Sequence, residues 1–229
     1  MFIKTYSYRF AEEILQHENH REAYEELIEI CKNCPVPVYK GKSKNQKKLD
    51  VVQQIMNTYF LETFKMKGWE EEPLVTPDTN EDALRSDFRK IFHKNASYGA
   101  ITIQIEVEFG NVASSYRNYF KFQLSYSYDL ADICVLIVPS QHLSTRIDSG
   151  VSNYEKILRE IPSAKLSITV PMLVIGLFDI SDNGMAADEW NVKDECMNLE
   201  IVKGSKDFFY HEHIKLVKRY ISQIYKSDN

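Results

Sequence analysis

Two continuous apolar runs restrict the fold of this chain more than any other feature. They are residues 132–139 and 170–178, and both are rich in aliphatic side chains without polar alternation. Such runs are typical of strands that are buried on both faces. Residues 152–161 between them have the pattern of a helix, with Ser152 as the expected N-cap and Glu155 completing a capping box. We therefore predict an α/β fold in which a central mixed β-sheet is flanked by helices.

A further strand, predicted over residues 101–109, alternates apolar and polar side chains. Its odd positions are apolar, and its even positions are Thr102, Gln104, Glu106 and Glu108. Because alternate residues of a strand share a face, the two carboxylates project together, about 6–7 Å apart. This separation suits two carboxylates that share a hard divalent cation. Taken alone, however, the stretch favours an edge strand with a solvated acidic face.

Asp87 is expected beside the same two carboxylates. A turn signal at residues 95–99 predicts that the segment starting at Asp87 pairs with residues 100–109 as an antiparallel strand. This pairing would place Asp87 next to Glu106 and Glu108. Three acids would then surround one point.

The remaining segments are predicted to be mostly helical. Helices are expected over residues 10–31 (one interrupted or two consecutive), 49–67, 112–127 and 211–225. The order of strand 101–109, helix 112–127 and strand 132–139 implies a parallel crossover. Residues 179–209 have little periodicity and are expected to form irregular connections with room for one short strand.

The 229 residues are expected to form a single domain. Its parts are an N-terminal helical region of about 1–68, a core of about 82–178 and a C-terminal extension of 179–229. The net charge of -5 gives no general attraction to nucleic acid, so a site for a polyanion has to be a local patch.

The chain has neither a long apolar stretch nor the features of a signal peptide at its start, so we expect a cytoplasmic protein without membrane association. Cys31 and Cys34 form a lone Cys-x-x-Cys without the second pair that structural zinc requires, and reduced thiols are expected. His211 and His213 are two residues apart on a predicted helix. Surface placement is therefore favoured over a metal or acid/base role.

The three acids follow the pattern of a known nuclease superfamily. An Asp on one strand, followed by Glu-x-Glu or Glu-x-Lys on the next, is the pattern of the PD-(D/E)xK nucleases. Four successive blocks resemble more specifically the BglII/BstYI/BamHI group of type II restriction endonucleases. These blocks are Ile105–Arg117, Asp132–Pro139, Ser149–Glu155 and Pro171–Gly176. Within that group the last catalytic position is Gln in some members and Glu in others, and Glu108 is similar to the latter.

The resemblance implies a restriction-endonuclease-like fold and a Mg²⁺-dependent hydrolysis of double-stranded DNA. Cleavage is expected at a short palindrome with a GATC core, leaving four-base 5′ overhangs. In the resemblance Asp87 and Glu106 are metal ligands, Glu108 orients or deprotonates the attacking water, and Glu71 is a candidate auxiliary acid. A palindrome implies a homodimer, with helix 112–127 as candidate interface. The aromatic residues of this helix fit an intramolecular core equally well.

Polar residues near the acids are candidates for reading DNA, since Arg can pair with guanine and Asn with adenine in the major groove. The candidate contacts are Asn111, Ser114, Arg117, Ser149, Ser152, Asn153, Lys42 and Lys44. The two lysines lie in a loop, residues 40–48, with five lysines and no acid, which could contact phosphates or simply be solvated. Arg117 could instead bind a phosphate or cross the dimer interface.

Two other functions remain open at this point. The first is another PD-(D/E)xK DNA nuclease, acting in repair or at junctions, which would share the metal site without reading a sequence. The second is a non-catalytic DNA-binding module with a vestigial site. The presence of acids at all three positions disfavours the second.

Overall fold

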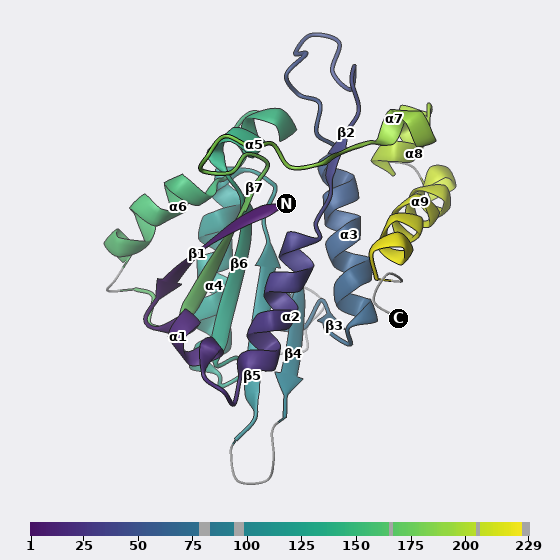
Figure 1. The fold of residues 1–229 in the computed structure, drawn as a ribbon. Helices are drawn as coiled ribbons and strands as arrows, with labels where there is room; N and C mark the ends of the chain where they lie inside the picture. Colours follow the sequence, from purple (N-terminus) through teal and green to yellow (C-terminus); the bar gives the residue numbers. More distant parts are fainter. Residues whose placement is uncertain (78–82, 94–98, 165–166, 205–206, 226–229) are drawn as a thin grey trace.

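The computed structural model describes residues 1–77, 83–93, 99–164, 167–204 and 207–225 (Figure 1). In these residues one sheet of six strands has the order β1-β7-β6-β5-β4-β3, and β2 and β8 form a separate pair. Strands β5, β6 and β7 are parallel to one another, whereas β1, β4 and β3 run antiparallel to their neighbours. The predicted α/β fold with a central mixed sheet is confirmed.

The elements have the following bounds. The strands are β1 (Phe2–Tyr8), β2 (Val36–Val38), β3 (Glu70–Glu71), β4 (Phe88–Phe92), β5 (Ile101–Val107), β6 (Ile133–Pro139), β7 (Met172–Phe178) and β8 (Glu189–Asn191). The helices are α1 (Ala11–Gln16), α2 (Arg21–Lys32), α3 (Gln53–Met66), α4 (Val112–Ser127), α5 (Gln141–Ile147), α6 (Tyr154–Glu160), α7 (Val192–Glu195), α8 (Leu199–Lys203) and α9 (Asp207–Tyr225), with a 3-10 turn η1 (Ile161–Ala164).

The sheet separates two apolar cores, as the continuous apolar runs predicted. In β6, Ile133 and Val135 belong to the core shared with α2, α3 and α9, whereas Cys134 and Leu136 belong to the core shared with α4 and α6. Figure 1 shows α2 and α3 on one side of the sheet and α4 on the other. Every residue of β6 is buried. This burial on both faces explains why β6 has no polar position.

A glycine in β7 permits the close approach of α6. A Cβ atom at Gly176 would lie 2.6 Å from Cδ2 of Tyr154, the first residue of α6. The Tyr154 hydroxyl donates a hydrogen bond of 2.8 Å to the carbonyl of Thr5 in β1. The start of α6, and the loop that leads into it, are thereby fixed against the sheet.

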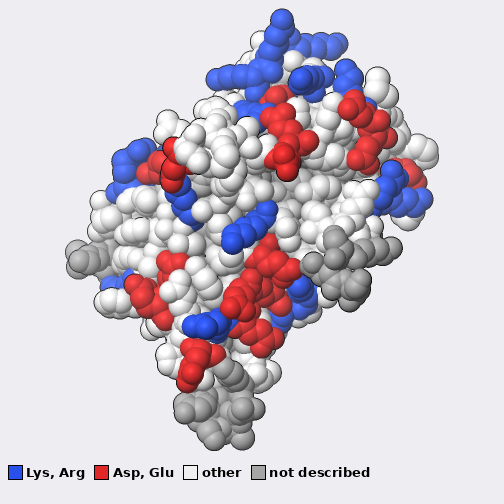
Figure 2. Space-filling model, in the orientation of Figure 1, with Lys and Arg blue, Asp and Glu red and all other residues white. Residues whose placement is uncertain are grey.

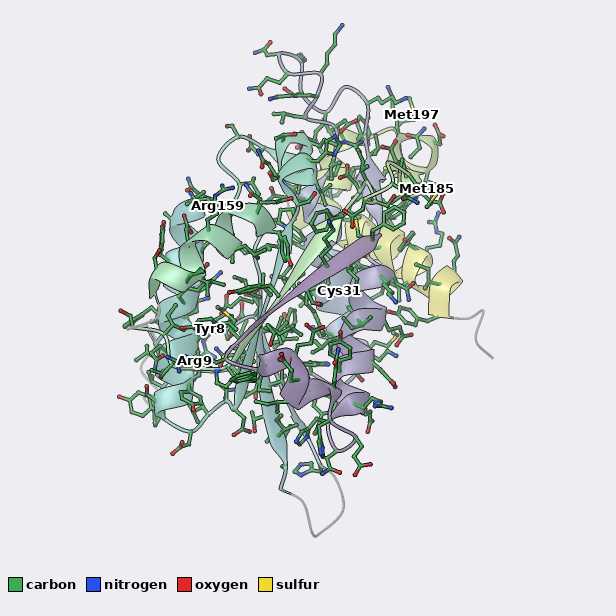
Figure 3. All side chains as sticks on the ribbon, turned by 60° about the vertical axis from the view of Figure 1, so that its left-hand side comes forward. Tyr8, Arg9, Cys31, Arg159, Met185 and Met197 are labelled. Carbon is green, nitrogen blue, oxygen red and sulfur yellow. The ribbon has the colours of Figure 1, made fainter. Side chains whose placement is uncertain are left out.

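The N-terminal region is only partly helical, which corrects the prediction for residues 1–68. Residues 10–31 form two helices as expected, but β1 is an edge strand that pairs with β7 along its whole length. The side chains of Tyr8 and Arg9 both donate to the carbonyl of Ile168, at 2.9 and 3.1 Å, and so tie the end of β1 to the segment before β7 (Figure 3). Cys31, on α2, lies fully buried beside the sheet.

The C-terminal region contains more regular structure than predicted. The closing helix α9 is confirmed, but α7 and α8 were not expected. The surface placement of His213 is wrong, because its side chain is 1% exposed. Its Nε2 lies 2.7 Å from Thr58 Oγ1 and its Nδ1 2.9 Å from the carbonyl oxygen of Val202, so this histidine joins α9 to α3 and α8.

Three further expectations concern a turn, membrane-spanning helices and the cysteines. The turn predicted at residues 95–99 lies outside the described residues except for Gly99, although the antiparallel pairing of β4 and β5 that flanks it is confirmed. Among the residues with described placement, no helix has the length and apolar character needed to cross a bilayer. All four cysteines are free thiols.

Candidate active site

The acidic strand β5 lies in the interior of the sheet, between β4 and β6. Glu106 and Glu108, which are 2% and 6% exposed, point toward α4. The edge-strand interpretation with a solvated acidic face is therefore wrong. The register pairs Phe88 with Ile105, which places Asp87 beside Glu106, and Asp87 Oδ2 accepts a hydrogen bond of 2.7 Å from the backbone N–H of Val107.

Glu106 is held by side chains from two other segments. The ammonium group of Lys121, on α4, donates to both carboxylate oxygens of Glu106 at 2.9 and 2.7 Å. The hydroxyl of Ser86 donates to Oε1 at 2.8 Å. Because Ser86 precedes Asp87 in the chain, this hydrogen bond also fixes the segment that carries the first acid.

Glu108 is held in a similar way. Its Oε1 accepts a hydrogen bond of 2.6 Å from the backbone N–H of Gly110, and its Oε2 accepts one of 2.9 Å from Asn118 Nδ2 on α4. Lys121 and Asn118 were not predicted as site residues. The signal was present, however, since they lie three residues apart and so project from one face of a helix that packs against the sheet.

Burial and mutual repulsion change the acidity of all three side chains. Burial raises the pKa of Asp87 and of Glu108. Burial, followed by the charge of Asp87, raises the pKa of Glu106 to about 7 despite the opposing effect of Lys121. A bound divalent cation would relieve this repulsion, because it favours the ionised forms.

The donor set fits a magnesium ion that retains part of its water shell. Mg²⁺ takes oxygen ligands and is commonly bound through one or two carboxylates. Asp87 and Glu106 supply two such groups, and Asp87 Oδ1 has no hydrogen-bond partner within the described part of the chain. No group of three or more His, Cys, Asp or Glu side chains is arranged as a metal site among the described residues. Water molecules would therefore complete the ligand shell.

A cavity of about 360 Å³ opens beside Asp87. It is lined by α3, by Val107 and by the acids Glu71 and Glu72. The candidate auxiliary acid Glu71 is exposed and forms an ion pair of 2.8 Å with Lys65. The charge of Glu72, not that of Glu71, contributes to the raised pKa of Asp87. Glu72 is thus a second candidate for an auxiliary acid.

Two groups of candidate DNA contacts meet at a short antiparallel bridge. Asn111 pairs with Val151. On either side of this pair, the Val112 N–H donates to the Gly150 carbonyl and the Ser152 N–H donates to the Gly110 carbonyl, both at 3.1 Å. The segment after β5 and the loop between α5 and α6 are therefore joined directly at the end of β5.

The N-cap of α6 is Asn153, which corrects the prediction of Ser152. Asn153 Oδ1 accepts a hydrogen bond of 3.0 Å from the Lys156 N–H. Glu155 closes no capping box, because its carboxylate accepts from the Gln141 N–H at 2.7 Å. Ser152 is 1% exposed and its hydroxyl has no partner among the described residues, so a base contact by Ser152 would require the loop to move.

The other candidates differ in how available their side chains are. Arg117 and Ser149 are exposed, whereas Asn111 caps α4 by accepting a hydrogen bond of 3.0 Å from the Ala113 N–H. Ser114 lies in α4, but its side chain is outside the described part of the structure.

The two candidate lysines of the 40–48 loop have different environments. Lys42 is partly buried and its ammonium group donates to the carbonyls of Val51 and Ile147, so it holds the loop against α5. Lys44 is exposed.

The basic loop also lies beside the candidate reading loop. A second cavity, of about 240 Å³, is lined by Lys48 together with Gln141, Ser149 and Asn153. Figure 2 shows Lys and Arg side chains gathered at the end of the molecule formed by the loop between β2 and α3, and acids gathered over α2. The basic side chains there are Lys40, Lys44, Lys47 and Lys48, all exposed. An anionic partner is therefore favoured at this end and disfavoured over α2.

The chain is similar to one group of known proteins. The family model described as restriction endonuclease BglII/BglIII matches residues 3–177. The crystal structure of BglII complexed with a DNA 16-mer has a TM-score of 0.61 at 17% identity, covering 80% of this chain and 79% of that chain. Free BglII has a TM-score of 0.53 at 17% identity, with 80% and 81% covered. No curated protein matches the chain. Because the family model spans most of its length, the chain belongs to the BglII/BglIII family of restriction endonucleases, which are site-specific deoxyribonucleases.

Proposed function

We propose that this endonuclease hydrolyses double-stranded DNA with Mg²⁺ at a short palindrome. The observation that carries this proposal is the placement of Asp87, which lines an open cavity, beside Glu106 of β5, with Glu108 directly after that strand. Mg²⁺ bound by Asp87 and Glu106 would neutralise charge at the phosphate and make a bound water a better nucleophile. The protein supplies the ligands and fixes their directions.

Glu108 is suited to orient the attacking water or to accept its proton. Gly110 and Asn118 fix its carboxylate by hydrogen bonds of 2.6 and 2.9 Å. Burial raises its pKa above the ordinary value, which makes it a better proton acceptor than a solvated glutamate. Its position corresponds to the one that often holds Lys in this superfamily.

The proposed cleavage site has a GATC core and leaves four-base 5′ overhangs. This specificity rests on the resemblance of the sequence blocks around Asn111 and Ser149–Asn153. The bridge that joins these two segments supports only their action from one place. The exposed lysines of the 40–48 loop would contact phosphates, which position the protein without reading sequence.

Digestion of a sequenced plasmid, with and without Mg²⁺, tests the proposal. Discrete fragments whose ends lie at GATC with four-base 5′ overhangs would support it in full. Cleavage at defined sites that lack GATC would reject the specificity alone. Cleavage at junctions or lesions without a defined sequence would favour a repair nuclease, and DNA binding without cleavage would favour a non-catalytic module.

The acidity of Glu106 gives a pH prediction. Its pKa of about 7 in the folded protein exceeds the ordinary value of 4.5, so the folded state binds the proton more tightly than the unfolded state. The stability of the metal-free protein should therefore fall as the pH rises from about 5 to about 7 and then level off. Urea denaturation over this range measures it, with Glu106→Gln as control. An equally steep fall in the variant would exclude Glu106 as its cause.

A homodimer is proposed, because a palindrome presents two equivalent half-sites. Helix α4 serves the core through Tyr119 and Phe122, which are buried, but it also exposes Tyr116 by 54% and Phe120 by 57%. These outward rings on the helix next to the catalytic strand support a contact between two copies.

Phe120→Asp is therefore expected to weaken the dimer, since it places a charge in the apolar contact. Sedimentation equilibrium would then detect monomers at concentrations where the wild type is dimeric. Phe208→Asp is the matched control, because Phe208 is 85% exposed on α9, far along the chain from α4. If both variants and the wild type sediment as monomers, free and on DNA, the dimer is rejected.

A further inference from the structure

Three polar pairs join α4 to β5 and to Glu108, which directly follows β5. Two of them are the contacts of Asn118 with Glu108 and of Lys121 with Glu106. In the third, Ser125 Oγ donates to Gln104 Oε1 at 2.6 Å. Steps of three and four residues along a helix advance about 4.5–6 Å, close to the roughly 6.6 Å between alternate residues of a strand, so the two rows stay in step.

Lys121 is the basic residue among these three pairs. Its side chain is 10% exposed and that of Glu106 is 3% exposed, and the ammonium group contacts both carboxylate oxygens. A buried lysine is costly, and apolar residues that replace a buried ion pair are often equally stable. Packing alone therefore does not explain a lysine at this position, which the neighbouring core would fill with an apolar side chain.

The contacts of Glu106 indicate that Lys121 orients its carboxylate. Within the described residues, Glu106 accepts side-chain hydrogen bonds from Ser86 at one oxygen and from Lys121 at both. Lys121 therefore determines how the carboxylate is turned relative to Asp87. Residues that hydrogen-bond a metal-binding carboxylate and fix its orientation contribute to cation affinity, although they do not touch the cation.

We propose that Lys121 is a positioning residue of the catalytic centre, which holds the Glu106 carboxylate in the orientation that a divalent cation requires. The inference rests on the proposed function, because it takes Glu106 as a ligand. In this superfamily the strand position of Glu108 often carries a lysine. In this chain the lysine beside the acids is Lys121 on α4 instead. Lys121 acts through Glu106 and contacts neither the cation nor the phosphate.

The test compares Ca²⁺ binding by the full-length wild type and by Lys121→Met, measured by isothermal titration calorimetry without DNA. The expected result is an affinity roughly tenfold to hundredfold lower in the variant, the usual effect of removing a partner of a metal ligand. The Mg²⁺ concentration for half-maximal cleavage should rise in parallel. Ser125→Ala is the matched control, because it removes the third pair of the same row without contacting an acid, and its Ca²⁺ affinity should equal that of the wild type.

Folding of each variant is checked by circular dichroism. If Lys121→Met does not fold, Lys121→Gln decides. Its amide can still donate a hydrogen bond to Glu106, so we expect its Ca²⁺ affinity to be lower than that of the wild type, by less than the loss expected for Lys121→Met. A folded variant that binds Ca²⁺ as tightly as the wild type, or more tightly, would overturn the role of Lys121 and leave the proposed function intact. A wild-type protein that binds no divalent cation would overturn both.

Discussion

The Glu106→Gln variant should cleave DNA roughly 10³-fold more slowly than the wild type, because it loses several kcal/mol of transition-state stabilisation supplied through the metal. Asp87→Asn should have a similar effect. Both substitutions remove a charge that binds the cation, and neither removes a group proposed to contact a base. Specific DNA binding should therefore persist. Single-turnover cleavage in Mg²⁺ and gel shifts in Ca²⁺ measure the two properties separately.

The control for these variants is Glu22→Gln on α2, which changes an exposed acid on the face that carries many acids. It should cleave at the wild-type rate. Circular dichroism separates a loss of chemistry from a loss of folding. Cleavage at the wild-type rate by either folded site variant would remove Asp87 or Glu106 from the catalytic centre.

Arg146→Met should lower the free energy of unfolding by about 3 kcal/mol, because it leaves a buried acid without its main charge partner. Arg146, on α5, contacts Asp50 through Nε and Nη2 at 3.0 and 3.1 Å. It also contacts Asp179 at 2.9 Å and Glu189 at 2.7 Å. Asp179 is 2% exposed, so most of the loss in stability comes from leaving its carboxylate buried without this partner. Urea denaturation measures the change.

A matched control exists for this prediction as well. Lys215 forms an ion pair of 2.8 Å with Glu212 on the surface of α9, where both side chains are more than half exposed. Exposed ion pairs contribute little to stability, so Lys215→Met should leave the denaturation midpoint unchanged. If Arg146→Met is equally silent, the ion pairs of Arg146 do not stabilise the buried Asp179 and the prediction is rejected.

The sequence predicted the strands that carry strong local patterns. The runs that became β6 and β7, and the alternation that became β5, fixed the middle of the sheet and the positions of the acids. It failed for β1, because an edge strand of mixed composition is selected by pairing with β7, about 170 residues away in the chain. The short helices α7 and α8 were missed for the same reason, since tertiary contacts decide such short pieces, whereas β8 is the one short strand allowed for in residues 179–209.

The environment of the acids could not be predicted from the strand alone. Alternation shows which side chains share a face, but it does not show what covers that face. Here Asn118, Lys121 and Ser125 of α4 cover the polar face of β5. Polar side chains whose alternation suggested exposure to solvent therefore form their hydrogen bonds inside the protein. His213 was misplaced for a similar reason, because Thr58 and the end of α8 supply its partners.

The acids on the strand and the loop candidates for DNA contact lie in surroundings that tolerate substitution differently. Glu106 lies on a strand with a neighbour on each side and α4 above it, so a substitution there disturbs several packed elements at once. Ser149 is exposed in the loop between α5 and α6, where a substitution alters the surface and little else. A substitution in this loop is therefore expected to cost less stability than a substitution at Glu106.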